Sequence, residues 1–128
     1  MKSADRTTAH SAAFSLVEVM IVVAIIAVVT LMAAPAIIKP RKQSEGRRIV
    51  NDARQLDAAI NQWAIEKSKK DGDAVVTSEA ATYLKCPWFT NDVLGNSYAI
   101  GTVGSNQVQI SSATKTSLAG VGIDWGPY

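Results

Sequence analysis

Glu18 is the most conspicuous candidate functional residue, because its carboxylate lies at the start of an apolar run. From Val19 to Ile38 the chain has twenty residues without Asp, Glu, Lys or Arg. At 1.5 Å per helical residue the run covers about 30 Å, the thickness of the hydrocarbon core of a bilayer. A carboxylate in or near hydrocarbon costs a few kcal/mol or more unless it finds a partner, so it marks a functional site by default. The chemistry to look for is charge pairing.

Residue types that catalyse reactions or bind metals are scarce. The only histidine is His10 and the only cysteine is Cys86, so removal of residues 1–13 would leave no imidazole. Ser-His and Cys-His nucleophilic sites and most zinc sites are then excluded. No pair of acidic residues is clustered, and a net charge of +2 is too small to imply nucleic acid. We therefore predict that the chain is not an enzyme and has no small-molecule substrate.

The N-terminal third predicts an export signal that stays attached as an anchor. Residues 1–13 are polar and weakly basic and end in small residues. The apolar stretch that follows, 14–38, is too long for an ordinary signal peptide and precedes no A-x-A-like cleavage site. We divide the chain into a leader (1–13), a transmembrane helix (14–38), an amphipathic continuation of the helix (39–72) and a small region of loops and antiparallel sheet (73–128).

An apolar stripe indicates that the helix continues beyond the membrane. Its members follow one another at spacings of four, three, four and three: Ile49, Ala53, Leu56, Ile60 and Trp63. This pattern predicts a helix as far as Lys70, with Gly72 able to end it. The stripe is too short to establish a coiled coil, so we expect a small sheet to cover it.

The C-terminal region reads as a short helix followed by strands. Residues 77–85 would form a helix capped by Thr77 or Ser78, and Cys86 would be a small buried residue. Strands are expected at 97–103 and 108–114 with a turn at 104–107, and the tail 120–128 would be an edge strand or an ordered loop. The predicted fold class is α+β, with a long N-terminal helix packed on a small antiparallel sheet.

The stretch "AFSLVE", Ala13 to Glu18, with the apolar run after it resembles the class III signal of type IV pilins and pseudopilins. In that family a prepilin peptidase cuts before an aromatic residue and N-methylates the new terminus, and a Glu follows four residues later. The resemblance implies cleavage between Ala13 and Phe14 and methylation of Phe14. It also implies a pilin-like fold and roles in assembly for Glu18 and for Pro35, which falls where many members carry a helix-kinking proline.

Cleavage before Phe14 would create an ammonium group that can compensate the Glu18 carboxylate. Glu18 could pair with its own terminus, four residues away on the same helix face, or with that of a neighbouring subunit. The resemblance favours the second, which gives register as well as attraction. The alternative is a plain anchor whose Glu18 sits at headgroup level.

Basic residues that follow the run conflict with this topology: Lys39, Arg41, Lys42, Arg47 and Arg48. A bare count of Lys and Arg would place the C-terminal side in the cytoplasm. The resemblance implies instead that the protein lies in the inner membrane with its C-terminal domain in the periplasm, and assembles into a periplasmic or cell-surface filament. The basic flank would then meet lipid headgroups before assembly. We disfavour DNA binding by it.

The segment "NDVLGNSYAIG" is similar to the Asp-x-x-Gly-Asn-x-Tyr segment of major pseudopilins, with matches at Asp92, Gly95, Asn96 and Tyr98. The resemblance implies a pseudopilin of a type II secretion system, which moves folded proteins across the outer membrane. Its partners would be the prepilin peptidase, identical and related pilin subunits and the inner-membrane assembly platform. The alternatives are a type IV pilus pilin for adhesion, motility or DNA uptake, and a membrane-tethered binding module that never polymerises.

Many major pseudopilins bind calcium near the C-terminus. After Glu79 the only carboxylates here are Asp92 and Asp124, few for a cation that takes six to eight oxygen ligands. We expect no cofactor, with calcium at these two residues as the alternative.

Two prolines and a glycine weaken the helix between its halves. Pro35 and Pro40 each remove an amide donor, and Gly46 adds flexibility. We predict that the stretch 35–46 changes helicity on assembly, the alternative being a continuous, kinked helix.

Overall fold

The computed structural model describes residues 14–128, and the side chains of all of them except Ala34 and Pro35. The chain divides into two compact units, Met1–Ile37 and Ile38–Tyr128. The elements follow in the order α1 (Leu16–Glu66), α2 (Thr77–Ala80), the 3-10 helix η1 (Ala81–Tyr83), β1 (Ala99–Thr102), β2 (Ser105–Gln109) and α3 (Ser112–Ser117). A long helix with a small antiparallel hairpin confirms the predicted α+β class.

The first part of α1 is long and apolar enough to cross a membrane. It contains an 18-residue window with a mean hydropathy of 2.9, none of which is buried. Its large apolar side chains are exposed, from 50% at Val19 to 77% at Leu16. So much contiguous apolar surface has to be covered by lipid or by other helices. The backbone is helical throughout Leu16–Glu66, including Pro35 and Pro40, so the predicted change in helicity concerns an assembled state and stays a prediction.

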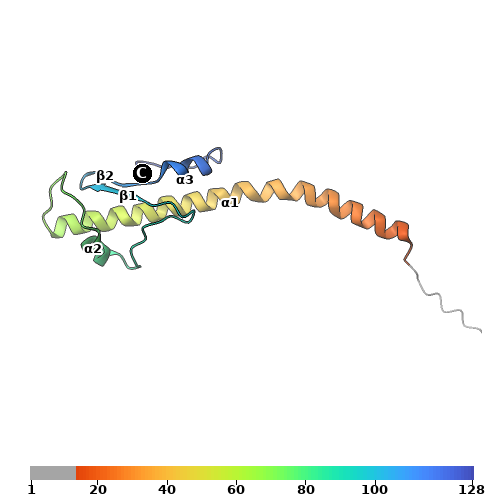
Figure 1. Ribbon diagram of the computed structural model, residues 1–128, viewed down its shortest axis with the longest axis horizontal. Helices are drawn as coiled ribbons and strands as arrows, with labels where there is room; N and C mark the ends of the chain where they lie inside the picture. The colour runs from red at the N-terminus through yellow and green to blue at the C-terminus, as the bar shows by residue number, and fades with distance from the viewer. Residues whose placement is uncertain (1–13) are drawn as a thin grey trace, which may run out of the picture. The chain divides into compact units, whose positions relative to one another are not determined.

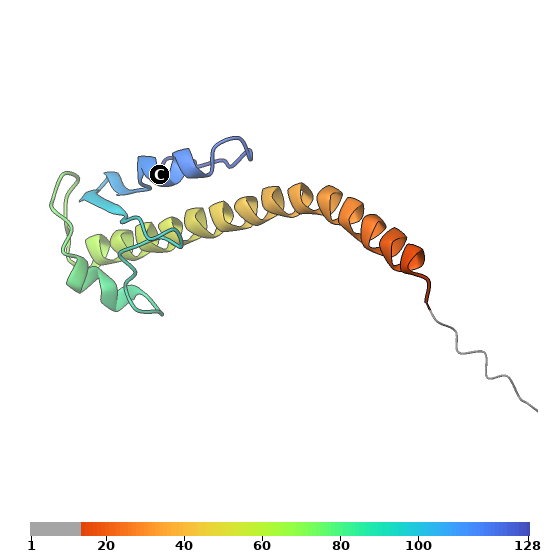
Figure 2. The same cartoon turned by 45° about the vertical axis from the view of Figure 1, so that its right-hand side comes forward.

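The second part of α1 forms the core of the unit Ile38–Tyr128. All five residues of the predicted apolar stripe are completely buried: Ile49, Ala53, Leu56, Ile60 and Trp63. They pack in one cluster with Tyr98, Val108 and Leu118. Figures 1 and 2 both show β1, β2 and α3 on one side of this part of α1, and α2 on the other. Helix, hairpin and tail thus share a single core.

The end of α1 lies four residues before the predicted Lys70. Ser68 has a φ of 52°, in the left-handed region. The amide of Lys69 donates to the carbonyl oxygen of Ala64 at 2.8 Å, and that of Ser68 donates to Ile65 at 3.2 Å. These two bonds form the Schellman motif that closes many helices, usually with Gly in the left-handed position. Ser68 takes the role that we had given to Gly72.

The hairpin is antiparallel as predicted, but its turn comes earlier. Thr102 pairs with Ser105, so residues 103 and 104 make the turn and β2 already begins at Ser105. Gly104 supplies the positive φ of 88° that this turn requires. Val108 and Ile110 are buried, 2% and 4% exposed, which confirms their predicted alternation.

Three local predictions are wrong. Residues 112–114, expected to be the end of a strand, belong to α3 (Ser112–Ser117), because the Ser111 side chain caps a helix by accepting from the amide of Ala113. Neither Thr77 nor Ser78 caps α2, whose cap position is Val76 without a side-chain hydrogen bond. Cys86 is exposed and not buried.

Candidate functional site

Ser15 and Glu18 form a capping box at the start of α1. The Ser15 hydroxyl accepts from the amide of Val17 at 3.3 Å, and Glu18 Oε2 accepts from the amide of Ser15 at 3.2 Å. In this arrangement the residue before the helix and the third residue within it satisfy donors that the first turn leaves free. The sequence contains its signature, Ser-x-x-Glu, which our reading of Glu18 alone missed.

Phe14 lies just before the capping box and is 84% exposed. It lines a shallow cavity together with Glu18 and Val19. An apolar residue before the cap often packs against the fourth helical residue, here Val19, and fixes the angle at which the chain enters the helix. The structure therefore brings Phe14 and Glu18 together within one turn. Ala13 lies outside the described residues, and Pro35 is far along α1 from both.

The Glu18 carboxylate is only partly satisfied within the subunit. Its Oε2 accepts the hydrogen bond from Ser15, whereas no donor within residues 14–128 reaches Oε1. An ionised carboxylate can accept up to about four hydrogen bonds. One oxygen thus remains available for a cationic or N–H partner from outside the described chain.

Asp92, a candidate calcium ligand, is the centre of a hydrogen-bonded lock. Its Oδ1 accepts from the backbone amides of Leu94 and Asn96, both at 2.9 Å. Its Oδ2 accepts from the hydroxyl of Thr114, and the side-chain Nδ2 of Asn96 donates to the same hydroxyl oxygen at 2.9 Å. The lock joins the loop before β1 to α3, and Gly95 permits it with a φ of 86°.

Tyr98, the last residue of the same segment, anchors the loop to α1. It is 7% exposed, and its hydroxyl donates to the carbonyl oxygen of Ile49 at 3.5 Å. Burial raises the pKa of Tyr98, and the charges of Asp52 and Asp92 raise it further. The phenol therefore stays neutral and remains a donor.

Asp124, the other candidate calcium ligand, is exposed and accepts from the amide of Gly126 at 2.9 Å. In the part of the chain that the structure describes, no group of three or more His, Cys, Asp or Glu side chains is placed to hold a metal ion. The structure does not gather these two residues into such a group.

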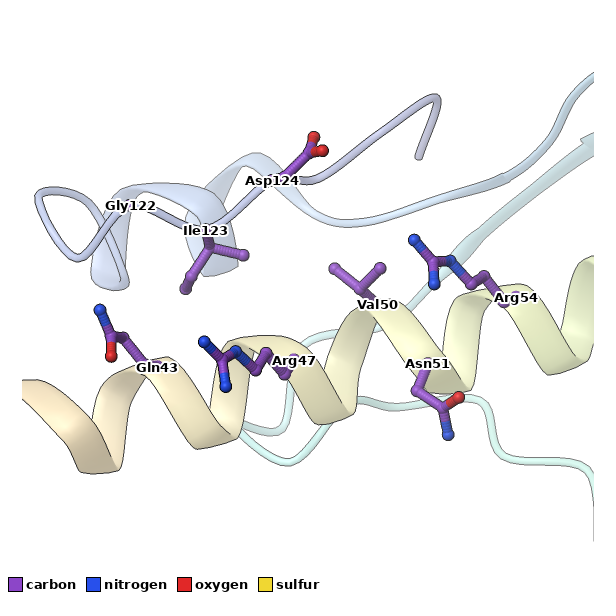
Figure 3. A pocket seen from close by; sticks show the side chains of 8 residues that line it. All are labelled: Gln43, Arg47, Val50, Asn51, Arg54, Gly122, Ile123 and Asp124. Atoms are coloured by element: carbon purple, nitrogen blue, oxygen red, sulfur yellow. The ribbon is translucent and has the colours of Figure 1, made fainter.

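A groove of about 330 Å³ runs between α1 and the C-terminal tail. Two apolar side chains line it, Val50 from the helix and Ile123 from the tail, beside the polar side chains of Gln43 and Asn51. Arg47 and Arg54 flank Val50, as Figure 3 shows, and Asp124 points away from the helix. We refer to it as the arginine groove.

The tail is seated on α1 by two contacts at one end of this groove. Gln43 Nε2 donates to the carbonyl oxygen of Val121 at 2.9 Å. Gly46 is buried, and a Cβ at this position would overlap the side chain of Ile123. Gly46 is thus a packing notch, whereas the sequence suggested only a weak point in the helix.

Residues 8–34 match the model of the prokaryotic N-terminal methylation motif. No curated protein and no solved structure matches the chain. The motif implies processing by prepilin peptidase and assembly with other pilin subunits, and with the apolar helix it suggests membrane anchoring. The N-terminal segment is therefore a prokaryotic N-terminal methylation motif, the kind of signal that type IV pilins and pseudopilins carry, and it supports a structural pilin-like subunit.

Proposed function

We propose that the chain is a pseudopilin of a type II secretion system that polymerises through the first part of α1. The observation that carries this proposal is the half-satisfied Glu18 carboxylate, placed within one turn of the residue that processing would make N-terminal. After cleavage the ammonium group of Phe14 in a neighbouring subunit supplies the missing partner. Ala13 and Phe14 flank the proposed cut, and Phe14 is methylated.

The energetics favour assembly over a lone anchor. An ion pair in an apolar bundle does not by itself add much net stability, but a buried charge without its partner is strongly unfavourable. A neighbouring subunit that docks in the wrong register leaves Glu18 unpaired. Packing of the exposed apolar side chains of α1 against neighbours supplies the attraction, and Glu18 selects one register.

The choice of a pseudopilin over a pilus pilin is supported by the segment from Asp92 to Tyr98. The residues that resemble the pseudopilin segment act together, since Asp92 and Asn96 hold α3 and Tyr98 is anchored on α1. Their shared role in packing explains why this spacing of residue types would be retained in a family of subunits.

Glu18→Ala tests the polymerisation step. We expect the variant to be inserted and cleaved, with a mature mass that begins at Phe14, but to yield few filaments in the sheared fraction. Glu45→Ala is the matched control, because Glu45 lies on the same helix outside the apolar run and pairs with Arg41. Filaments at the wild-type level from Glu18→Ala would refute the proposed role of Glu18.

Deletion of the gene in its own host distinguishes the kinds of filament. A pseudopilin predicts that a folded exoprotein accumulates in the periplasm while surface pili persist. Loss of surface pili or twitching with normal secretion would indicate a type IV pilus pilin. A chain that is processed but never recovered in any filament would indicate a tethered binding module.

A further inference from the structure

We propose that the arginine groove binds the phosphate headgroup of an anionic phospholipid in the membrane that holds α1. The inference goes beyond the proposed function and does not depend on polymerisation. It concerns the subunit while it is still in the bilayer.

The first reason is that the two guanidinium groups of the groove have no hydrogen-bond or ion-pair partner among residues 14–128. Among the described side chains, neither Arg47 nor Arg54 makes a hydrogen bond or an ion pair, whereas Arg41 pairs with Glu45 at 3.4 Å. The guanidinium fork matches the geometry of phosphate oxygens. Figure 3 shows both arginines on the tail side of α1.

The second reason is the shape of the groove between these charges. Between the two arginines, Val50 and Ile123 add a small apolar surface, and the carboxylate of Asp124 is directed away from the helix. A ligand with an anionic group and an apolar body is complementary to such a surface. A phospholipid has both, with the glycerol and the start of the acyl chains next to the phosphate.

The third reason is the short distance along the helix from Ile38, the last residue of the apolar run, to Arg47. Arg47 follows Ile38 by nine residues, a rise of about 13 Å. Helical side chains lean back over the preceding turn, so the guanidinium is about 8 Å above Ile38. Figure 3 shows it on the Gln43 side of its own backbone. The headgroup layer is about 5–8 Å thick on each face of a bilayer, so Arg47 is within reach of phosphates.

Depth also separates the two arginines. Arg54 lies seven residues beyond Arg47, about 10 Å farther along the helix. A lipid can enter only from the membrane side and should depend mainly on Arg47. A free phosphate or a soluble acidic chain should depend on both arginines equally.

Headgroup binding also explains the basic residues on the exported flank of the apolar run. Such residues are unusual outside the cytoplasm. Anionic lipids at the membrane surface attract such residues, and a guanidinium group held at a phosphate strengthens binding by about five-fold. A groove that holds a phosphate would keep the subunit at a fixed depth until it leaves the bilayer.

The test uses the full mature chain in nanodiscs of equal parts phosphatidylcholine and phosphatidylglycerol, with retained lipids counted by native mass spectrometry. We expect the wild type to retain phosphatidylglycerol preferentially. Arg47→Gln should reduce that preference by about five-fold, Arg54→Gln by less than two-fold. Arg47→Lys should keep most of it.

Arg48→Gln is the matched control, since it removes the same charge one residue away and outside the groove. Arg48 interacts with Asp52 and not with the groove: burial raises the pKa of Asp52, and the positive charge of Arg48 partly offsets this rise. Circular dichroism of each variant confirms that the fold is intact.

Three results would overturn the proposal. The first is a wild type without preference for phosphatidylglycerol. The second is equal losses for Arg47, Arg48 and Arg54, which would mean general attraction of the basic flank. The third concerns soluble anions, tested as inorganic phosphate or single-stranded DNA with the detergent-solubilised chain. If either one binds, and Arg47→Gln and Arg54→Gln weaken that binding equally, the ligand of the groove is a soluble anion.

Discussion

Replacement of Asp92 by Ala should strongly destabilise the unit Ile38–Tyr128, because this carboxylate holds α3 against the loop before β1. Asp92 is 8% exposed, and Thr114, to which Oδ2 is bonded, is completely buried. The change removes the acceptor of three hydrogen bonds at once. The amides of Leu94 and Asn96 and the hydroxyl of Thr114 all lose their partner.

The magnitude follows from the fate of each donor. A hydrogen bond to a charged group contributes about 1.5–3 kcal/mol, and a buried donor left without a partner costs about 1–3 kcal/mol. The two amides belong to a loop and can turn toward water, whereas the buried Thr114 hydroxyl cannot. We therefore expect a loss of about 3–5 kcal/mol for Asp92→Ala. For Thr114→Val, which keeps the side-chain shape, we expect about 1.5–3 kcal/mol.

The assay is chemical denaturation of the full chain in detergent, followed by tryptophan fluorescence, in which the completely buried Trp63 reports on the core. The double variant should lose less than the sum of the single losses, because both residues belong to one lock. A loss below about 1 kcal/mol for Asp92→Ala would refute the reasoning. The reasoning would also be refuted if EDTA destabilised the wild type as much as Asp92→Ala does, because Asp92 would then act as a metal ligand.

Three further changes test other parts of the chain. Ser15→Ala should weaken the cap of α1 by about 1 kcal/mol, seen as faster amide exchange in its first turn, and Ser15→Thr should restore protection; identical exchange in all forms would disprove the capping box. Gly46→Ala should lower the free energy of unfolding by about 1–3 kcal/mol, because the new methyl group overlaps Ile123. At an open helical site the same change would raise it by up to about 1 kcal/mol, so a shift of the denaturation curve toward higher denaturant would contradict the packing role of Gly46. Asp52→Asn should raise the free energy of unfolding at pH 7, because burial raises the pKa of this carboxyl and the folded state loses stability as the pH rises through the window above 3.8. The gain should vanish as the pH falls below that value, and a gain that does not change with pH would contradict it.

The sequence predicted those parts of the fold that depend on one element at a time. Periodicity reports a single buried face, so the stripe from Ile49 to Trp63 could be identified without knowing what covers it. The start of α1 could have been predicted in the same way, because Ser15 and Glu18 have the spacing of a capping box, but we did not predict it. The end of α1 was not, because Ser68 adopts a backbone conformation that its residue type does not favour.

Features that join distant parts of the chain could not be read. Helix α3 contains Ser and Thr without an apolar stripe, and its place depends on the bond between Thr114 and Asp92, which are 22 residues apart. The arginine groove exists only because the tail is seated on α1 at Gly46. The sequence placed Arg47 in a basic flank that would meet lipid headgroups, but no local pattern indicated that Arg47 and Arg54 line one groove. Such features depend on tertiary packing, which the spacing of residues along the chain does not reveal.

The seat of the tail on α1 also sets a limit on how far the helix can unwind. Residues 36–41 are exposed, so melting them breaks no contact with the core. Beyond them, Lys42 donates to the carbonyl oxygen of Ser117 at 3.3 Å, and Gln43 is bonded to Val121. Unwinding that reached Gly46 would also displace Ile123. Six residues that pass from helix to extended chain lengthen the backbone by about 11–13 Å. The tail therefore limits unwinding, and about 13 Å is the largest extension that a subunit can undergo between Pro35 and Lys42 while its core stays intact.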